Sequence, residues 1–252
     1  MTTLVDCPDS TAGEWSFHIF DIPVRVKIWF WISILIIGGE QKLGPILIWV
    51  GVCFFSILLH ELGHVAAFRL CGVRAEVMLY GWGGLAIPRY GVSGFFPRIL
   101  VSLAGPFAGF CLAGITLWAA LASRASIQFG FHMFLPVLHV VPRGVAYSTW
   151  HLLLNDLLWV NFYWGLMNLL PVYPLDGGQA ALACFERSDP DHGKRKSLIL
   201  SAGLAGALAI YDVLEQNGYL VLMFAILAVS SLQMLDGLRG SSASRANRSP
   251  RW

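Results

Sequence analysis

Two histidines and a glutamate lie close together with the spacing of a metal site. The segment reads His60-Glu61-Leu62-Gly63-His64. Histidines four residues apart share one face of an α-helix, so both imidazoles can bind one zinc ion at about 2.0–2.1 Å and leave a position open for water. Glu61 would then accept a proton from that water as a general base. The spacing predicts a zinc-dependent hydrolase, with a peptide bond as the favoured substrate.

The motif lies in a long apolar segment, Pro45 to Leu70. Ionisable side chains are costly to place in hydrocarbon, so an ionisable cluster in such a segment indicates a functional site. If the match were due to chance, three ionisable residues would raise the free energy of the protein in a bilayer without having a function. The setting therefore favours a metal centre within the membrane.

A catalytic zinc takes three protein ligands, and the motif supplies two. Asp176 is the best candidate for the third. It follows Pro171 and Pro174 and precedes two glycines, a pattern that breaks regular helix and allows close approach of backbone. Irregular backbone at membrane depth is tolerated only where protein or a water-filled cavity covers it. Weaker candidates are Asp156, Glu186, His132, His139 and His151.

The composition is that of a multi-pass membrane protein. Of 252 residues, 56% are hydrophobic and 13% are charged, and the mean hydropathy is +0.65. A formal net charge of only +2 gives no basic field for nucleic acid, so we expect no nucleic-acid partner. The five cysteines contain no CxxC pair, which predicts packing residues and no disulfide framework.

We predict an all-α polytopic membrane protein with about six transmembrane helices and a small β-hairpin at the membrane edge. The hairpin covers residues 77–87, where apolar β-formers flank a glycine cluster; an ordinary loop is the alternative. A further apolar piece, 132–141, is too short to cross and is placed in the interface. The predicted spans are 24–37, 45–70, 98–122, 150–170, 197–210 and 219–235.

The distribution of Lys and Arg predicts the orientation of these spans. Most basic residues fall on the side that holds both termini, so the positive-inside rule places both termini in the cytoplasm. The zinc motif and Asp176 then approach the same depth from the same leaflet. We predict three regions: a cytoplasmic segment over 1–23, the membrane domain over 24–237 and a disordered basic tail over 238–252.

Two motifs together resemble the site-2 protease family of intramembrane zinc metalloproteases. They are the HELGH segment and, about a hundred residues later, Asn168-Leu-Leu-Pro171 with Leu175-Asp176-Gly177. The resemblance covers a core of about residues 45–187. It implies one Zn²⁺ per chain held by His60, His64 and Asp176, with Glu61 as catalytic base and Asn168 binding substrate.

The resemblance also implies a setting for the reaction. The substrate would be a transmembrane protein cut in or near the bilayer, as in regulated intramembrane proteolysis, and the hairpin would pair with an unwound substrate strand. The connections are too short for PDZ or CBS domains, so the chain resembles the compact members. Such a protein would sit in a bacterial cell membrane, in contact with the lipid bilayer. Its regulation would depend on a membrane partner or on the stability of the substrate.

Two other functions are compatible with a polar cluster in a membrane. A non-catalytic scaffold derived from such a protease would have no need of the full set His60, Glu61, His64 and Asp176. A metal transporter would need polar residues along a path to the far side, but the second predicted span is apolar from Ile46 to Leu59 apart from Ser56. The sequence favours the protease.

Overall fold

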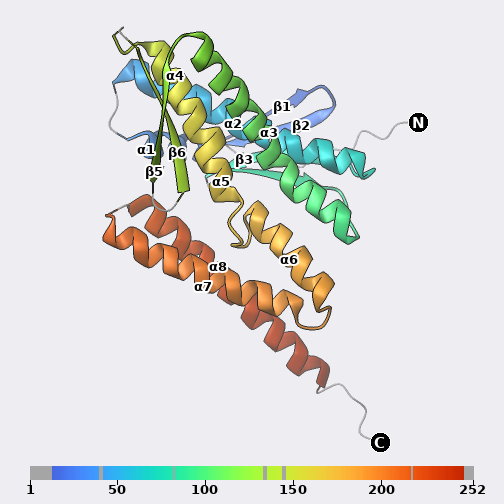
Figure 1. Cartoon of the computed structure of the whole chain (residues 1–252). Helices are drawn as coiled ribbons and strands as arrows, with labels where there is room; N and C mark the ends of the chain where they lie inside the picture. The colour runs from blue at the N-terminus through green and yellow to red at the C-terminus, as the bar shows by residue number, and fades with distance from the viewer. Residues whose placement is uncertain are drawn as a thin grey trace, which may run out of the picture. The chain divides into compact units, whose positions relative to one another are not determined.

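The computed structural model describes residues 13–39, 42–81, 83–132, 135–143, 146–216 and 218–246 (Figure 1). The chain divides into two compact units. The first comprises Met1–Val92 and Ala104–Leu166, and the second comprises Ser93–Leu103 and Met167–Trp252. The motif histidines belong to the first unit and Asp176 to the second.

A four-stranded sheet lies in the first unit. Its order is β1 (Glu14–Ile19), β2 (Ile22–Lys27), β3 (Ala75–Tyr80) and β4 (Gly83–Pro88), with antiparallel pairs at both sides and a parallel β2–β3 pair in the middle. Alternate side chains of the two central strands point into the core, as a period of two requires. Those most deeply buried, each at most 2% exposed, are Val24, Val26, Val77 and Leu79.

Ion pairs join segments that are far apart in the sequence. Arg25 in β2 donates a hydrogen bond to Glu76 in β3 at 2.5 Å. Arg69, near the end of the helix that carries the zinc motif, donates to Asp21 in the β1–β2 turn at 2.7 Å. The N-terminal hairpin is thereby fixed beside the hairpin that follows the motif helix.

The predicted hairpin at 77–87 is present as β3–β4, but it is half of a larger sheet. The apolar run that the sequence predicts as helix from Val24 begins instead as strand β2, and the helix starts at Ile28. Residues 14–23, predicted as a polar segment, contain β1 and the start of β2, while 1–12 lie outside the described residues. The alternation in IPVRVK is the local signal for this strand.

Helices and a second hairpin complete the first unit. They are α1 (Ile28–Gly38), α2 (Leu43–Leu70), most of α3 (Phe95–Ala122), β5 (Ser126–His132), β6 (Leu135–Val141), α4 (Thr149–Leu158), the π-helix η1 (Trp159–Tyr163) and the start of α5 (Trp164–Asn168). Six buried residues form a core between α3, β6 and α4: Ala113, Ala120, Ala125, Val140, Leu154 and Leu158. The segment 132–141, predicted as an interfacial piece, contains strand β6 and the last residue of β5.

Three helices make up most of the second unit: α6 (Asp176–Ser188), α7 (Gly193–Leu214) and α8 (Gly218–Ala246). The start of α3 joins them through Arg98, which donates to Glu186 at 2.6 Å, and through Phe95, whose ring lies 4.8 Å from the Arg187 guanidinium. Helix α8 continues to Ala246, so 238–246, predicted as part of a disordered tail, is helical. The rest of that tail, 247–252, is not among the described residues.

Four described helices are long and apolar enough to cross a membrane: Leu43–Leu70, Phe95–Ala122, Gly193–Leu214 and Gly218–Leu238. The prediction of about six spans is therefore only partly confirmed. Helix α1 has 11 residues and is about 16 Å long, against about 30 Å of hydrocarbon. The predicted span 150–170 is built from three consecutive segments, α4, η1 and α5.

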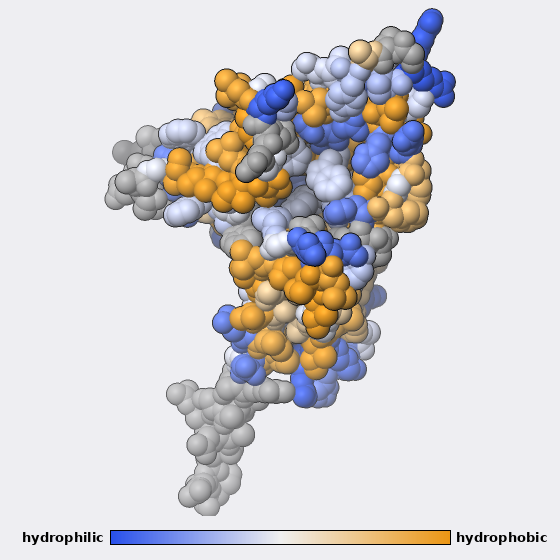
Figure 2. Space-filling model, turned by 90° about the vertical axis from the view of Figure 1, so that its left-hand side faces the viewer, coloured by the Kyte–Doolittle hydropathy of each residue, from blue (hydrophilic) through white to orange (hydrophobic). Residues whose placement is uncertain are grey.

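The surfaces of the long helices are apolar, as lipid contact requires. Figure 2 shows broad hydrophobic areas on one face of the molecule. Large apolar side chains of α2, α3 and α7 are more than half exposed, among them Leu47, Phe107, Trp118 and Ile210. A soluble protein rarely leaves so many large apolar side chains uncovered. The chain is a multi-pass integral membrane protein.

Leu79 provides a test of the sheet core, because it is fully buried in β3. We expect Leu79→Ala to lower the free energy of unfolding by about 2–5 kcal/mol through lost burial and a cavity. Leu85→Ala in the neighbouring strand β4, where the side chain is 47% exposed, should cost less than about 1 kcal/mol. Unfolding in detergent measures both, and equal losses would contradict the described sheet.

Candidate metal centre

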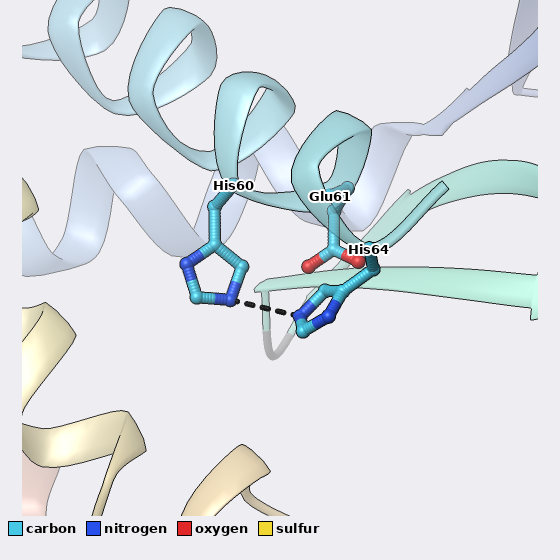
Figure 3. Close-up of side chains that lie close together, drawn as sticks. All are labelled: His60, Glu61 and His64. Carbon is cyan, nitrogen blue, oxygen red and sulfur yellow. Dashed lines mark hydrogen bonds between the residues drawn. The ribbon is translucent and has the colours of Figure 1, made fainter. Parts of the chain in front are cut away.

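Helix α2 carries His60, Glu61 and His64 on two successive turns (Figure 3). The Nε2 atoms of the two histidines lie 3.2 Å apart, with ring centroids 4.9 Å apart and ring planes at 74°. Ligand atoms of all three residues lie within 4.8 Å of one another. Glu61 is 5% exposed and His64 7% exposed. The i, i+4 spacing thus brings both imidazoles together as predicted.

This geometry fits a zinc ion. At a Zn–N distance of about 2.0–2.1 Å, two ligand nitrogens on a tetrahedral ion lie about 3.3–3.4 Å apart. The observed 3.2 Å between the Nε2 atoms is close to that separation. Imidazole nitrogen is also a preferred zinc donor. The pair can therefore bind one ion with little movement of either side chain.

Gly105 allows the backbone of α3 to approach these nitrogens closely. A Cβ atom at position 105 would lie 2.6 Å from Nε2 of His60 and would also clash with Nε2 of His64. Gly63 brings the same two helices together, since a Cβ there would lie 2.6 Å from the carbonyl oxygen of Ala104. The place of Gly105 at the histidines depends on the contact between α2 and α3, which the sequence motifs do not indicate.

The sheet supports Glu61 from its other side. A Cβ atom on Gly84 of β4 would lie 2.5 Å from Oε1 of Glu61, so strand backbone passes directly by the carboxyl group. Burial raises the pKa of the Tyr80 phenol at the end of β3, and the negative charge of Glu61 raises it further. The phenol thus stays protonated near neutral pH. The hairpin β3–β4 therefore forms one wall of the site.

A buried hydrogen bond lies one helical turn before His60. The amide of Asn161 in η1 donates to Oγ of Ser56 at 2.8 Å and to the carbonyl oxygen of Leu157 at 2.9 Å. Ser56 and Asn161 are 2% and 3% exposed. Ser56, His60 and His64 follow one another at intervals of four, so this bond helps to fix which face of α2 meets the site. No local pattern in the sequence indicates this pair.

Asp176 is the first residue of α6, directly after the broken segment. Two close approaches hold this helix end against the segment. A Cβ on Gly177 would meet the Leu169 carbonyl and lie 2.6 Å from the Leu170 oxygen, and one on Gly178 would lie 2.5 Å from the Tyr173 nitrogen. The helix is broken before Asp176, as the prolines predicted, and Asp176 begins the next helix. Zinc binding by Asp176 remains a prediction, as does substrate binding by Asn168, the last residue of α5.

The weaker candidate ligands have other surroundings. Ring contacts at 5.3 Å place His132 against Trp159 and Tyr163, and His151 forms a capping box with Ser148 at the start of α4. Glu186 pairs with Arg98, and His139 is exposed on β6. Within the described part of the chain, His60, Glu61 and His64 are the group of three that could hold a metal.

Comparisons with known proteins test the family resemblance. The sequence profile of Peptidase family M50 matches residues 48–210. A zinc metalloprotease of Methanocaldococcus jannaschii is 26% identical over 230 residues, which is 88% of this chain and 56% of that protein. The chain thus spans about half the length of this curated relative.

A solved structure shows the same fold. The site-2 protease from Methanocaldococcus jannaschii aligns with 88% of this chain and 95% of its own, at 20% identity and a TM-score of 0.59. The family match spans well over half of the sequence and includes both motifs. The resemblance predicted from those motifs is confirmed: the chain belongs to peptidase family M50.

Proposed function

We propose that this chain is an intramembrane zinc metalloprotease, with one Zn²⁺ held by His60, His64 and Asp176. The observation that carries the proposal is the pair of Nε2 atoms 3.2 Å apart in front of Gly105, with the buried Glu61 carboxylate beside them. The pair lies in a helix long enough to cross a bilayer. Membership of a peptidase family supports the reaction class.

Each residue has a defined role in this proposal. When bound, zinc would polarise the substrate carbonyl and lower the pKa of a water molecule. Glu61 accepts the proton of the attacking water and passes it to the leaving amine. Gly105 keeps the space before the imidazoles free, and β4 limits the movement of the Glu61 carboxyl group. Asn168 would hydrogen-bond the substrate.

The edge of the sheet offers a way to present the substrate. Among the described strands, β4 pairs only with β3 and lies at the edge of the sheet. An extended peptide that paired with this edge would run past Gly84 and so close to Glu61. Peptide bonds in a regular helix are engaged in internal hydrogen bonds, so strand pairing would stabilise the unwound form of a transmembrane substrate.

The biological setting completes the proposal. The substrate is a membrane protein cut in regulated intramembrane proteolysis, in a bacterial cell membrane with both termini of this chain in the cytoplasm. The asymmetric distribution of Lys and Arg supports this orientation. A regulatory membrane partner would control cleavage.

Substitution of the proposed base tests the mechanism. Glu61→Gln keeps the size of the side chain but cannot accept the proton, so cleavage should fall by about 10²–10⁴-fold. Zinc content should stay at one per chain. Proteomic comparison of membranes containing either protein should reveal a transmembrane protein that accumulates uncut in the variant. Equal processing in both membranes would exclude Glu61 as the base.

Removal of a histidine tests the metal site. His60→Ala should reduce zinc in the purified, detergent-solubilised chain from about one equivalent to well below half, because one imidazole donor is lost. His139→Ala is the matched control, since His139 is exposed on β6. Elemental analysis measures both variants. Undiminished zinc in His60→Ala would contradict the assignment.

Gly105 allows a test by added volume. In Gly105→Ala the new methyl group would meet both imidazoles, and we expect zinc affinity to fall at least tenfold. Gly114→Ala in the same helix is the control, because a Cβ there meets no atom within 4 Å and should leave affinity unchanged. Competition with a chelator gives both affinities. Similar affinities for the two variants would show that the space before the histidines is not needed for zinc.

A further inference from the structure

The broken segment before Asp176 has backbone groups that no helix satisfies. Pro171 and Pro174 lack N–H groups, and the segment turns on short local bonds, from Val172 N to Leu170 O at 2.7 Å and from Leu175 N to Val172 O at 2.8 Å. The N–H of Tyr173 points instead at another helix. In an apolar environment such a donor must find a partner within the protein.

That partner is Ser201 of α7. Tyr173 N donates to Oγ of Ser201 at 2.9 Å, and the Ser201 hydroxyl donates to the carbonyl oxygen of Pro171 at 3.4 Å. Ser201 is 0% exposed. A serine in an apolar helix commonly bonds back to its own helix, four residues earlier. Both hydrogen bonds described for Ser201 go to the broken segment instead.

Ser231 of α8 makes a weaker version of this contact. Its hydroxyl donates to Leu227 O in its own helix at 2.9 Å and lies 3.4 Å from the carbonyl oxygen of Tyr173. Ser231 is also 0% exposed. A hydroxyl has one proton, and in Ser231 it favours the shorter bond, to Leu227 O. Ser231 therefore packs against the Tyr173 carbonyl and hydrogen-bonds it only weakly. Ser201 provides the main hydrogen bond to the segment.

The backbone that Ser201 holds is the surface on which α6 begins. Gly178 approaches the Tyr173 nitrogen so closely that a Cβ would lie 2.5 Å from it, and Gln179 N donates to Leu175 O at 2.9 Å. Asp176 lies between these contacts. A shift of Tyr173 would therefore displace the first turn of α6, and Asp176 with it.

We propose that Ser201 is a positioning residue for Asp176, and that α7 thereby contributes to zinc affinity from outside the catalytic motifs. The inference rests on the proposed function, in which Asp176 is a zinc ligand. Residues that orient a ligand through hydrogen bonds typically change metal affinity by about 10–100-fold when removed. Ser201 does not contact Asp176 in this proposal. It holds the backbone N–H of Tyr173, three residues before Asp176.

The test compares three variants of the full-length chain in detergent. Ser201→Ala removes the acceptor, Ser201→Thr keeps a hydroxyl oxygen at the same position, and Ser197→Ala is the control. Ser197 lies one turn earlier in α7 and is 1% exposed, and none of its described contacts is a hydrogen bond to the broken segment. Zinc affinity is measured by competition with a chelator, and amide exchange of residues 169–178 is measured on the metal-free chain.

We expect Ser201→Ala to weaken zinc binding at least tenfold and to speed exchange of the Tyr173 amide. Ser201→Thr should recover affinity to within about threefold of the wild type, and Ser197→Ala should match the wild type. If Ser201→Ala does not purify folded, Ser201→Cys, whose thiol is a weak acceptor, should show the same loss.

Three results would overturn the inference. They are unchanged zinc affinity in Ser201→Ala, an equal loss in Ser197→Ala, and no recovery in Ser201→Thr. A drop in melting temperature alone, with zinc affinity intact, would make Ser201 a purely structural residue. If the wild type itself binds no zinc, the proposed function fails, whereas tight zinc binding by both wild type and Ser201→Ala refutes only the role of Ser201.

Discussion

The requirement that polar groups in an apolar environment be satisfied within the protein governs this structure. His60, Glu61 and His64 lie in a helix long enough to cross a bilayer, and α3, β4 and the Ser56–Asn161 pair surround them. The backbone freed by Pro171 and Pro174 is covered by serines of α7 and α8. At the motif and at the broken segment, specific neighbours thus support the residues of the proposed chemistry.

Close backbone approach is the second constraint on the site. Gly63 and Gly105 bring α2 and α3 together at the histidines, Gly84 brings a strand to Glu61, and Gly177 and Gly178 seat the start of α6. At each position a methyl group would collide with backbone or with an active-site side chain. Small residues allow helices to pack closely where hydrophobic burial gives no driving force between them.

Local patterns predicted the chemistry and the class of fold. The HELGH spacing placed both imidazoles on one face of a helix, and the glycine cluster predicted the hairpin at 77–87. The strand at Ile22–Lys27 was missed, because its pairing with β3 is decided by residues 53 positions away and its apolar content suited a helix. The roles of Gly105, Asn161 and Ser201 depend on contacts between helices that sequence spacing does not reveal. The count of six spans is confirmed only in part, since β2 shortens α1.

The central claim is that His60, His64 and Asp176 bind one zinc ion. Zinc K-edge X-ray absorption on the purified wild-type chain and on Asp176→Ala tests it most directly. We predict two imidazole nitrogens and a carboxylate oxygen at about 2.0–2.2 Å in the wild type, and loss of the carboxylate signal in the variant. A wild-type spectrum without imidazole ligands, or an unchanged first shell in Asp176→Ala, would contradict the account.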